Sequence, residues 1–257
     1  MICGSQQRHS DTKADSTCSQ SEPMLTIILP SLVCDAQYLR CISAIRAAML
    51  NKVKYEIISV VKEVAAFFDI TSEDLHILPE VRPGIYAAMN VGLSYAKGTY
   101  VYFLGQDDIM LPQFADVFTK GANQMADIIL ANVFWGTGVV YKNHQSPYSL
   151  VRRNWCHQGV IYKRKLFKEF SIEFPEEYSS QADHYVNIRF VGVKKSVHKY
   201  SECIAWYSAG GFSSRNCDLV FRNRFPFLVL DNFGFLFFFI VVVRRKSLYL
   251  VRKFLNK

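Results

Sequence analysis

The sequence predicts an α/β fold, in which a central mixed sheet is flanked by helices. Short apolar runs that are rich in β-branched and aromatic residues recur along the chain, bounded by Gly or Pro, as expected of buried strands. Between them lie segments whose apolar residues recur at three- and four-residue steps, which is typical of helices. The chain has 257 residues and half of them are hydrophobic, enough for one domain with a substantial core.

The first elements follow from these patterns. Residues 1–22 are polar and charged, so we expect them to be disordered, and no apolar signal segment follows Met1. Residues 24–29 form a compact apolar run that we expect to be a buried strand ending at Pro30. Residues 36–50 carry an apolar stripe typical of the crossover helix of a βαβ unit, made of Leu39, Ile42, Ile45 and Met49.

The middle of the chain continues the alternation. Residues 55–61 and 76–78 are predicted as the second and third strands. Residues 84–98 are predicted as a helix that ends at Gly98, since one stripe contains Ile85, Ala88, Met89, Leu93 and Ala96. A buried strand over residues 100–104 follows, and then a helix after Pro112. Residues 128–134 and 139–141 are predicted as an antiparallel pair, because two glycines mark a turn between them.

The last part contains three further elements. Residues 160–162 are predicted as an aromatic strand that leads into a basic helix start, a helix opens near residues 180–185, and a strand lies within residues 193–206. The seven cysteines are odd in number and lack paired metal-binding spacing. We interpret them as reduced thiols in a cytosolic compartment.

Two adjacent carboxylates, Asp107 and Asp108, follow the strand over residues 100–104. Ligands of open α/β sheets bind beyond the carboxyl ends of the strands. Two acids in a desolvated site repel each other unless a cation or protons offset their charge, and a hard divalent ion accepts both carboxylate and phosphate oxygens. A polar turn that caps the helix after Pro112 would explain the same pair.

Three motifs carry a resemblance to a known family: residues 84–90 (Gly-Ile-Tyr-Ala-Ala-Met-Asn), residues 96–100 (Ala-Lys-Gly-Thr-Tyr) and residues 103–108 (Phe-Leu-Gly-Gln-Asp-Asp). Together they resemble family 2 glycosyltransferases, particularly bacterial enzymes that build surface polysaccharide. The resemblance implies a GT-A fold and a Mn or Mg ion held against the diphosphate of a nucleotide-sugar. It implies Asp108 as a metal ligand, Asp107 as its neighbour on the metal and donor side, and Asn90 as a donor-side residue.

Other donor contacts are implied by the same resemblance. Pro30 and Ser31 would lie in the loop that holds the nucleotide. Relatives usually carry Asp-Gly-x-Ser-x-Asp after the second strand to bind the base, whereas this chain has Val-Lys-Glu-Val at residues 61–64, so Glu63 is either a substitute or part of a surface turn. Arg82 would lie near a helix N-terminus and bind phosphate, or be a solvated side chain. Gly211 belongs to a Gly-Gly-x-Ser loop that closes over the donor, or to an ordinary linker.

The acceptor side is implied by two further sites. Relatives of the polysaccharide-building type carry His-Gln where this chain has His157 and Gln158, near the metal or the acceptor; a lone His beside a strand is otherwise a packed or surface residue. Asp183 falls in the first turn of a predicted helix, where capping alone would explain it. In the family an acid at this place is the general base, and a carboxylate can accept the proton of an attacking sugar hydroxyl.

The formal charge of +8 is concentrated in the tail, where eight basic residues follow residue 221 against Asp231 alone. The nearly neutral body argues against nucleic acid as a partner. In the predicted tail, residues 215–257, the uninterrupted apolar run spans only residues 233–243, which is shorter than the roughly 20 residues of a spanning helix. We expect the tail to lie on the membrane surface, the alternative being an apolar helix packed on the domain or on a partner.

The combined interpretation is a glycosyltransferase domain over residues 23–214. It would transfer a sugar, with inversion, from a nucleotide-sugar to a hydroxyl of a lipid-linked or growing surface glycan. It would be cytoplasmic and peripheral on the inner face of the cell membrane. A nucleotidyltransferase is an alternative, although residues 30–35 lack a basic, Gly-rich nucleotide loop. A non-catalytic membrane scaffold is the other, since the base-binding run is missing.

Overall fold

The computed structural model describes residues 24–63, 72–208 and 218–255, with the side chains of the last helix described as far as residue 247. The expectation of disorder for residues 1–22 therefore lies outside the described residues. Four cysteines lie in the described part and all are free thiols: Cys34, Cys41, Cys156 and Cys203.

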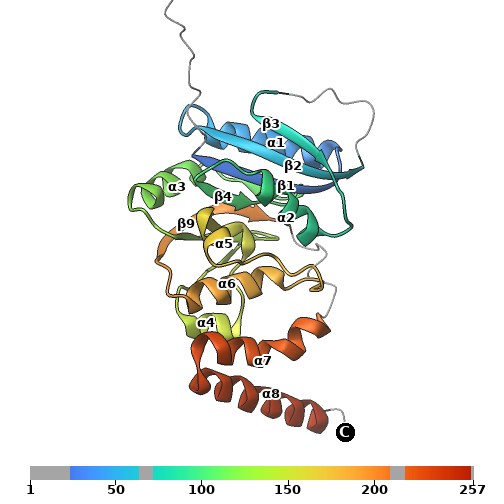
Figure 1. Cartoon of the computed structure of the whole chain (residues 1–257), viewed down its shortest axis with the longest axis vertical. Coiled ribbons are helices and arrows are strands. Elements are labelled where there is room, and N and C mark those ends of the chain that lie inside the picture. The colour runs from blue at the N-terminus through green and yellow to red at the C-terminus, as the bar shows by residue number, and fades with distance from the viewer. Residues whose placement is uncertain (1–23, 64–71, 209–217, 256–257) are drawn as a thin grey trace, which may run out of the picture.

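A mixed, nine-stranded sheet forms the centre of the described chain, with the strand order β3-β2-β1-β4-β8-β6-β9-β5 and β7 paired to β6 (Figure 1). The strands β1 to β4 are parallel, and β8 runs antiparallel to both β4 and β6. The strand bounds are β1 (Leu25–Val33), β2 (Tyr55–Glu63), β3 (Leu75–Pro79), β4 (Tyr100–Phe103), β5 (Ile109–Met110), β6 (Ile128–Trp135), β7 (Val139–Tyr141), β8 (Val160–Lys163) and β9 (Val197–Tyr207). The predicted α/β class and the antiparallel β6–β7 pair are confirmed.

Helices cover both faces of this sheet and bury a separate apolar cluster against each face. One cluster contains side chains of α1 (Ala36–Met49) and α3 (Phe114–Asn123). The other contains side chains of α2 (Ile85–Tyr95), α5 (Lys165–Glu169) and α6 (Ala182–Gly192). A short helix α4 (Pro147–Arg152) and a 3-10 turn η1 (His157–Gly159) lie between β7 and β8. The fold is therefore a three-layer α/β/α arrangement.

The first strand extends beyond its predicted end, because β1 continues through Pro30 to Val33. The carbonyl of Ile28 accepts a hydrogen bond from the Leu104 amide on the β4 side, and the ladder with β4 ends there. Pro30 faces the same side two residues later, where no ladder bond requires its missing N–H. The prediction that Pro30 stops the strand is therefore wrong, whereas its place at the carboxyl edge of the sheet is retained.

The helix α2 buries most of the predicted stripe, since Ala88, Met89 and Ala96 are buried and Leu93 packs against the same apolar cluster. Ile85 is 44% exposed, whereas Tyr86, Ala87, Ala88, Met89 and Gly92 are buried. A Cβ on Gly92 would lie 2.5 Å from Cγ2 of Ile28, so small residues allow the helix to approach β1 closely. The prediction of the stripe is therefore wrong only for Ile85, the first residue of the helix. The helix also ends at Tyr95, three residues before Gly98.

Two C-terminal helices extend the helical layer away from the sheet (Figure 1). The helix α7 (Leu219–Phe233) packs on α6, and the outermost helix α8 (Phe235–Leu255) packs on α7. Phe221, Phe225 and Val229 of α7 are buried in the same apolar cluster as α6. No helix within the described ranges is both long and apolar enough to span a membrane.

Candidate active site

The carboxyl group of Asp108 is buried at the carboxyl end of β4, with an exposed fraction of 1%. Its Oδ2 accepts a hydrogen bond from Nε2 of Gln158 at 2.7 Å, and its Oδ1 accepts one from the amide of Ser208 at 3.0 Å. Burial, followed by repulsion from Asp107, raises the pKa of Asp108 to about 7. The ionised carboxylate of Asp108 is thus unfavourable in this environment, and a cation beside it would stabilise the ionised form.

The backbone around this acid is fixed by contacts from distant parts of the chain. Oε1 of Gln106 accepts from the amide of Leu32 at 2.6 Å, which connects the end of β1 to the acidic turn. Oγ of Ser208 donates to the carbonyl of Asp107 at 2.6 Å. A Cβ at Gly105 would lie 2.8 Å from Oδ1 of Asp107 and 2.9 Å from Oδ2 of Asp108, so a larger residue there would displace these carboxylates. The turn is therefore built by β1, β4 and the end of β9 together.

The residues of this turn fit a divalent metal ion. No cluster of three or more His, Cys, Asp or Glu side chains suited to a metal occurs in the described part of the chain. Mg²⁺ and similar hard ions are commonly bound by one or two carboxylates and complete their coordination with water and substrate phosphates. Asp107 and Asp108 supply such a pair, and burial, followed by repulsion from Asp107, disfavours the charged form of Asp108 when no cation is near.

The two residues of the His-Gln motif behave differently. Gln158 contacts Asp108 directly, as given above. The ring of His157 packs against Phe103 and Phe174, with centroids 5.4 and 6.0 Å apart, and both ring nitrogens are buried without a hydrogen-bond partner among the described residues. Burial lowers the pKa of His157 to about 4, so the ring is neutral near pH 7. The structure thus places Gln158, but not the His157 nitrogens, in contact with the acidic turn.

Asp183 lies in the first turn of α6, and the residue as a whole is half-buried. Nδ2 of Asn154 donates to its Oδ2 at 2.6 Å, and the hydroxyl of Tyr86 donates to its Oδ1 at 3.4 Å. Asn154 is itself held by Asn187 at 3.0 Å, and Asn187 accepts from the Tyr162 hydroxyl at 2.8 Å. Burial raises the pKa of Asp183 to about 6, so this carboxyl ionises close to neutral pH. The hydrogen bonds through Asn154, Asn187 and Tyr162 fix its orientation.

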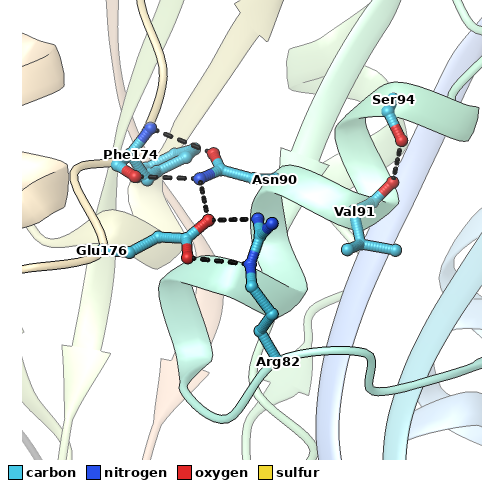
Figure 2. A network of polar contacts seen from close by, with 6 residues as sticks. All are labelled: Arg82, Asn90, Val91, Ser94, Phe174 and Glu176. Carbon is cyan, nitrogen blue, oxygen red and sulfur yellow. Dashed lines mark hydrogen bonds and ion pairs between the residues drawn. The ribbon is translucent and has the colours of Figure 1, made fainter.

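The predicted donor residues Arg82 and Asn90 belong to a separate polar network (Figure 2). Arg82 forms an ion pair with Glu176 at 2.6 Å. Nδ2 of Asn90 donates to the carbonyl of Phe174 at 2.9 Å and to Glu176 at 3.3 Å, and its Oδ1 accepts from the Phe174 amide at 3.0 Å. These contacts bind α2 to the loop before α6, and no contact among the described residues joins either side chain to the acidic turn.

The remaining predicted residues are spread along the carboxyl edge of the sheet or beyond the described ranges. Ser31 is buried in β1, and its Oγ donates to the Leu29 carbonyl at 3.3 Å. Pro30 precedes it, beside the strand end that Gln106 holds. Glu63 is the exposed last residue of β2. Gly211 lies outside the described residues, so the structure does not describe its loop.

The sequence did not identify three residues that complete the site. They are Gln106, Asn154 and Ser208, which contact β1, Asp183 and Asp108, respectively. The sequence could have indicated Gln106, because it directly precedes the acidic pair. The Asn154 contact depends on how the segment before η1 lies against α6. The amide of Ser208 is a backbone group, so no residue pattern reveals it.

Comparison with known proteins identifies several relatives. The chain is 27% identical over 226 residues to a PGL/p-HBAD biosynthesis glycosyltransferase of Mycobacterium bovis, a match that covers 79% of this chain and 84% of the relative. A protein of the same description from Mycobacterium tuberculosis matches equally well.

Solved structures also resemble this fold. The structure of residues 1–349 of S. aureus TarS in complex with UDP-GlcNAc has a TM-score of 0.67 at 15% identity, and the match covers 81% of this chain and 66% of that one. A mannosyltransferase from Pyrobaculum calidifontis, in complex with GDP-Man and Mn2+, has a TM-score of 0.56 at 15% identity, covering 84% and 64% of the two chains. This chain thus spans somewhat less than two thirds of these structures' own length, and the likeness confirms the GT-A fold.

The family itself is shown by sequence. The model described as glycosyl transferase family 2 matches residues 26–178, which is more than half of the chain. The matched region contains β1 to β8 and the acidic turn with its Gln158 partner. The chain therefore belongs to glycosyl transferase family 2, a family of enzymes that transfer sugars.

Proposed function

We propose that this protein is a metal-dependent, inverting glycosyltransferase that moves a sugar from a nucleotide-sugar to a hydroxyl of a lipid-linked or growing surface glycan. The observation that carries the proposal is the pair of acidic centres, Asp108 on the acidic turn and Asp183 on α6, whose pKa values are both raised by burial. One group suits a cation and a diphosphate, and the other suits proton acceptance.

The donor end of the proposed site is the acidic turn. Asp107 and Asp108 would hold Mn or Mg, which supplies charge neutralisation for the departing nucleoside diphosphate. Gln158 and Ser208 position the Asp108 carboxylate by hydrogen bonds to both of its oxygens. The relatives support the choice of donor, because S. aureus TarS was solved with UDP-GlcNAc and the Pyrobaculum enzyme with GDP-Man and Mn2+.

The acceptor end is Asp183. A sugar hydroxyl that attacks the anomeric carbon must lose its proton, and the carboxylate would accept it at one oxygen while Asn154 holds the other. A pKa of about 6 leaves Asp183 mostly ionised at pH 7 and still basic enough to take a proton. Direct attack by the acceptor, with no enzyme nucleophile, gives inversion at the anomeric carbon.

The composition of the tail is the basis for the proposed acceptor and the proposed location. Exposed apolar residues of α8 (Phe235, Leu236, Phe239 and Val243) lie beside basic Arg244, Arg245 and Lys246. Such a combination binds anionic membrane surfaces. We place the protein on the cytoplasmic face of the membrane, where a lipid-linked glycan would reach it.

The test is release of nucleoside diphosphate from a panel of UDP-, GDP- and dTDP-sugars, with Mn, with Mg and with a chelator, in membranes that contain the native acceptor. We expect release from one donor, dependent on metal and lost in Asp108→Asn. Asp116→Asn is the matched control, because Asp116 is an exposed acid on α3 that pairs with Lys52. Equal release by Asp108→Asn and wild type, or release that survives the chelator, would contradict the metal role.

A further inference from the structure

A cavity of about 370 Å³ lies beside the candidate base, between residues 142–155 and the start of the basic part of α8. Its lining includes four cationic side chains, Lys142, Arg152, Arg153 and Arg244. No carboxylate lines it. The cavity is thus a concentration of positive charge on a part of the molecule that the proposed donor site does not use.

Some arginines of the described chain have an acidic partner, whereas the four cavity cations have none. Arg46, Arg82 and Arg224 form ion pairs with Asp74, Glu176 and Glu177. Among the described residues, none of the four cavity cations forms an ion pair with a carboxylate. Like charges gathered without counter-ions repel each other, so an anion in this cavity would be favoured over an empty one.

The cavity cations are held by rings and by the backbone, which leaves hydrogen-bond donors available. The guanidinium of Arg153 lies 4.0 Å from the ring centroid of Tyr141 and donates to the carbonyl of Lys142 at 3.0 Å. That of Arg244 donates to the carbonyl of Arg152 at 3.4 Å. A guanidinium has five N–H donors in a planar fork that matches phosphate oxygens. The geometry therefore suits a phosphate group.

An apolar groove of about 450 Å³ continues from this cavity between α4 and α8. The two hollows share Tyr148, Arg152 and Arg244, and the groove adds apolar side chains that include Phe239 and Val243. A free phosphate or a nucleotide would use only the cations. A ligand that uses both hollows has an anionic head joined to an apolar chain, which is the chemistry of a lipid phosphate.

The cavity also reaches the candidate base. Asn154 lines it, and Nδ2 of Asn154 donates to Oδ2 of Asp183 at 2.6 Å. A lipid head bound among the cations is therefore one side chain away from Asp183. A sugar carried on that head would extend toward the carboxylate.

We propose that this cavity and groove bind an anionic lipid that carries the acceptor, with its phosphate among Lys142, Arg152, Arg153 and Arg244 and its chain along α4 and α8. The acceptor role rests on the proposed function; the lipid binding does not. The site would orient the acceptor hydroxyl toward Asp183 and would make α8 part of the substrate site as well as a contact with the membrane.

The binding test uses the full chain and three soluble ligands: dihexanoyl phosphatidic acid, glycerol phosphate and dihexanoyl phosphatidylcholine, measured by calorimetry. They present the anionic head with chains, the head alone, and chains with a zwitterionic head. We expect phosphatidic acid to bind at least ten times more tightly than either control ligand. Equal binding of glycerol phosphate would show a site for free phosphate and would overturn the proposal.

Variants locate the site. The double variant Arg152→Gln/Arg153→Gln should weaken phosphatidic acid binding at least tenfold. Lys165→Gln/Lys168→Gln is the matched control, because it removes two exposed charges from α5, away from the cavity, and should bind like wild type. Phe239→Ser should weaken binding of phosphatidic acid without changing that of glycerol phosphate. Equal lipid affinity in the arginine and lysine double variants would overturn the assignment.

Activity separates the two proposals. In membranes with the native acceptor, the arginine double variant should raise the acceptor KM at least tenfold while kcat stays within threefold. When Arg153→Lys replaces Arg153→Gln in this double variant, the acceptor KM should fall part of the way back to that of wild type. If wild type binds phosphatidic acid through the cavity but releases no nucleoside diphosphate from any donor, the proposed function fails and the lipid site stands. If transfer occurs and the double variant keeps both its lipid affinity and its acceptor KM, the lipid site fails and the function stands.

Discussion

At the residue scale, two carboxyl groups are kept in surroundings that disfavour their charge, but they differ in their neighbours. Each accepts a hydrogen bond at both oxygens, Asp108 from Gln158 and Ser208 and Asp183 from Asn154 and Tyr86, but only Asp108 stands beside a second acid. The first arrangement calls for an external cation. The second keeps an isolated carboxylate close to its titration point, which suits a proton acceptor.

Asp183→Asn should reduce transfer by roughly 10²- to 10⁴-fold, the usual contribution of a general base, while donor binding is kept. In the wild type, kcat/KM should fall about tenfold for each pH unit below the pKa of about 6, because only the ionised carboxyl accepts a proton. A pH–rate profile of acceptor transfer, recorded for both proteins, measures the loss of rate in Asp183→Asn and the acid limb of the wild type. An unchanged acid limb in the residual activity of the variant would show that another group is the base.

Asn154→Ala should move the acid limb of that profile to higher pH. Burial is the main cause that raises the pKa of Asp183, and the hydrogen bond from Asn154 opposes it, so removal of the amide should raise the pKa further. Asn123→Ala, at an exposed position on α3, is the matched control and should leave the profile in place. A shift to lower pH would contradict the assigned role of Asn154.

Asp108→Asn should stabilise the metal-free protein at pH 8. The folded pKa of about 7 lies above the ordinary value of 3.8, so the folded state binds more protons in this window and stability falls as pH rises through it, by about 4 kcal/mol in total. Asp108→Asn does not lose stability in this way, so the difference in stability between the variant and the wild type should shrink toward zero near pH 4. Thermal unfolding with and without Mn checks this, because Mn at pH 8 should raise the Tm of the wild type only.

At the scale of elements, the junction of β1, β2 and β4 depends on one glycine and one buried acid. The hydroxyl of Thr26 donates to Oε1 of Glu56 at 2.5 Å, and the amides of Lys97 and Gly98 donate to Glu56 at 2.7 Å and to Thr26 at 2.8 Å. A Cβ on Gly98 would meet the backbone nitrogen of Thr26 at 2.4 Å. The turn that leads into β4 thus rests directly on β1.

Gly98→Ala should therefore destabilise the fold by about 1–3 kcal/mol or more, because backbone must move to make room. Lys97→Ala is the neighbouring control, since the Lys97 side chain is exposed and only its amide joins the network. Denaturant unfolding measures both. Equal midpoints for the two variants would show that the turn adjusts without cost.

Most elements were predictable because each is specified locally. The strand Tyr100–Phe103 is a bounded apolar run, and the helix Ala36–Met49 begins after Asp35, whose side chain accepts from the Tyr38 amide at 2.9 Å. Two details differ from the prediction: β1 passes Pro30 because β4 has ended there, and Ile85, the first residue of α2, is exposed although most of its stripe is buried. For the site, Asp107, Asp108 and Asp183 were visible in the sequence, whereas the Asn154 and Ser208 contacts arise from loop paths that no short motif records.

At the scale of the whole molecule, the C-terminal helices connect the enzyme core to a basic, apolar outer face. The helix α7 buries Phe221, Phe225 and Val229 in the cluster that also contains α6, and α6 carries Asp183. The basic residues that dominate the net charge of +8 lie mainly in these helices and beyond. The segment that packs against α6 therefore also carries most of the basic charge.

A chain that ends at residue 217 should lose a large part of its stability. Removing α7 exposes its apolar partners on α6, and each buried Phe or Val contributes about 1.5–3 kcal/mol, so the loss approaches the whole stability of an ordinary domain. A chain that ends at residue 255 is the control and should unfold like the full protein. Circular dichroism melts compare them; a cooperative transition of equal midpoint in the shorter chain would show that α7 is dispensable.

The contact between Asp108 and Ser208 also bears on the order of events during synthesis. The two residues are 100 positions apart, and β9, which ends next to Ser208, pairs with β6 and with the edge strand β5. Contacts of such sequence separation form late, because a long loop must close first. A nascent chain that has released β1 to β8 from the ribosome therefore still has an incomplete acidic turn. The site assembles only after the segment that contains Ser208 has emerged.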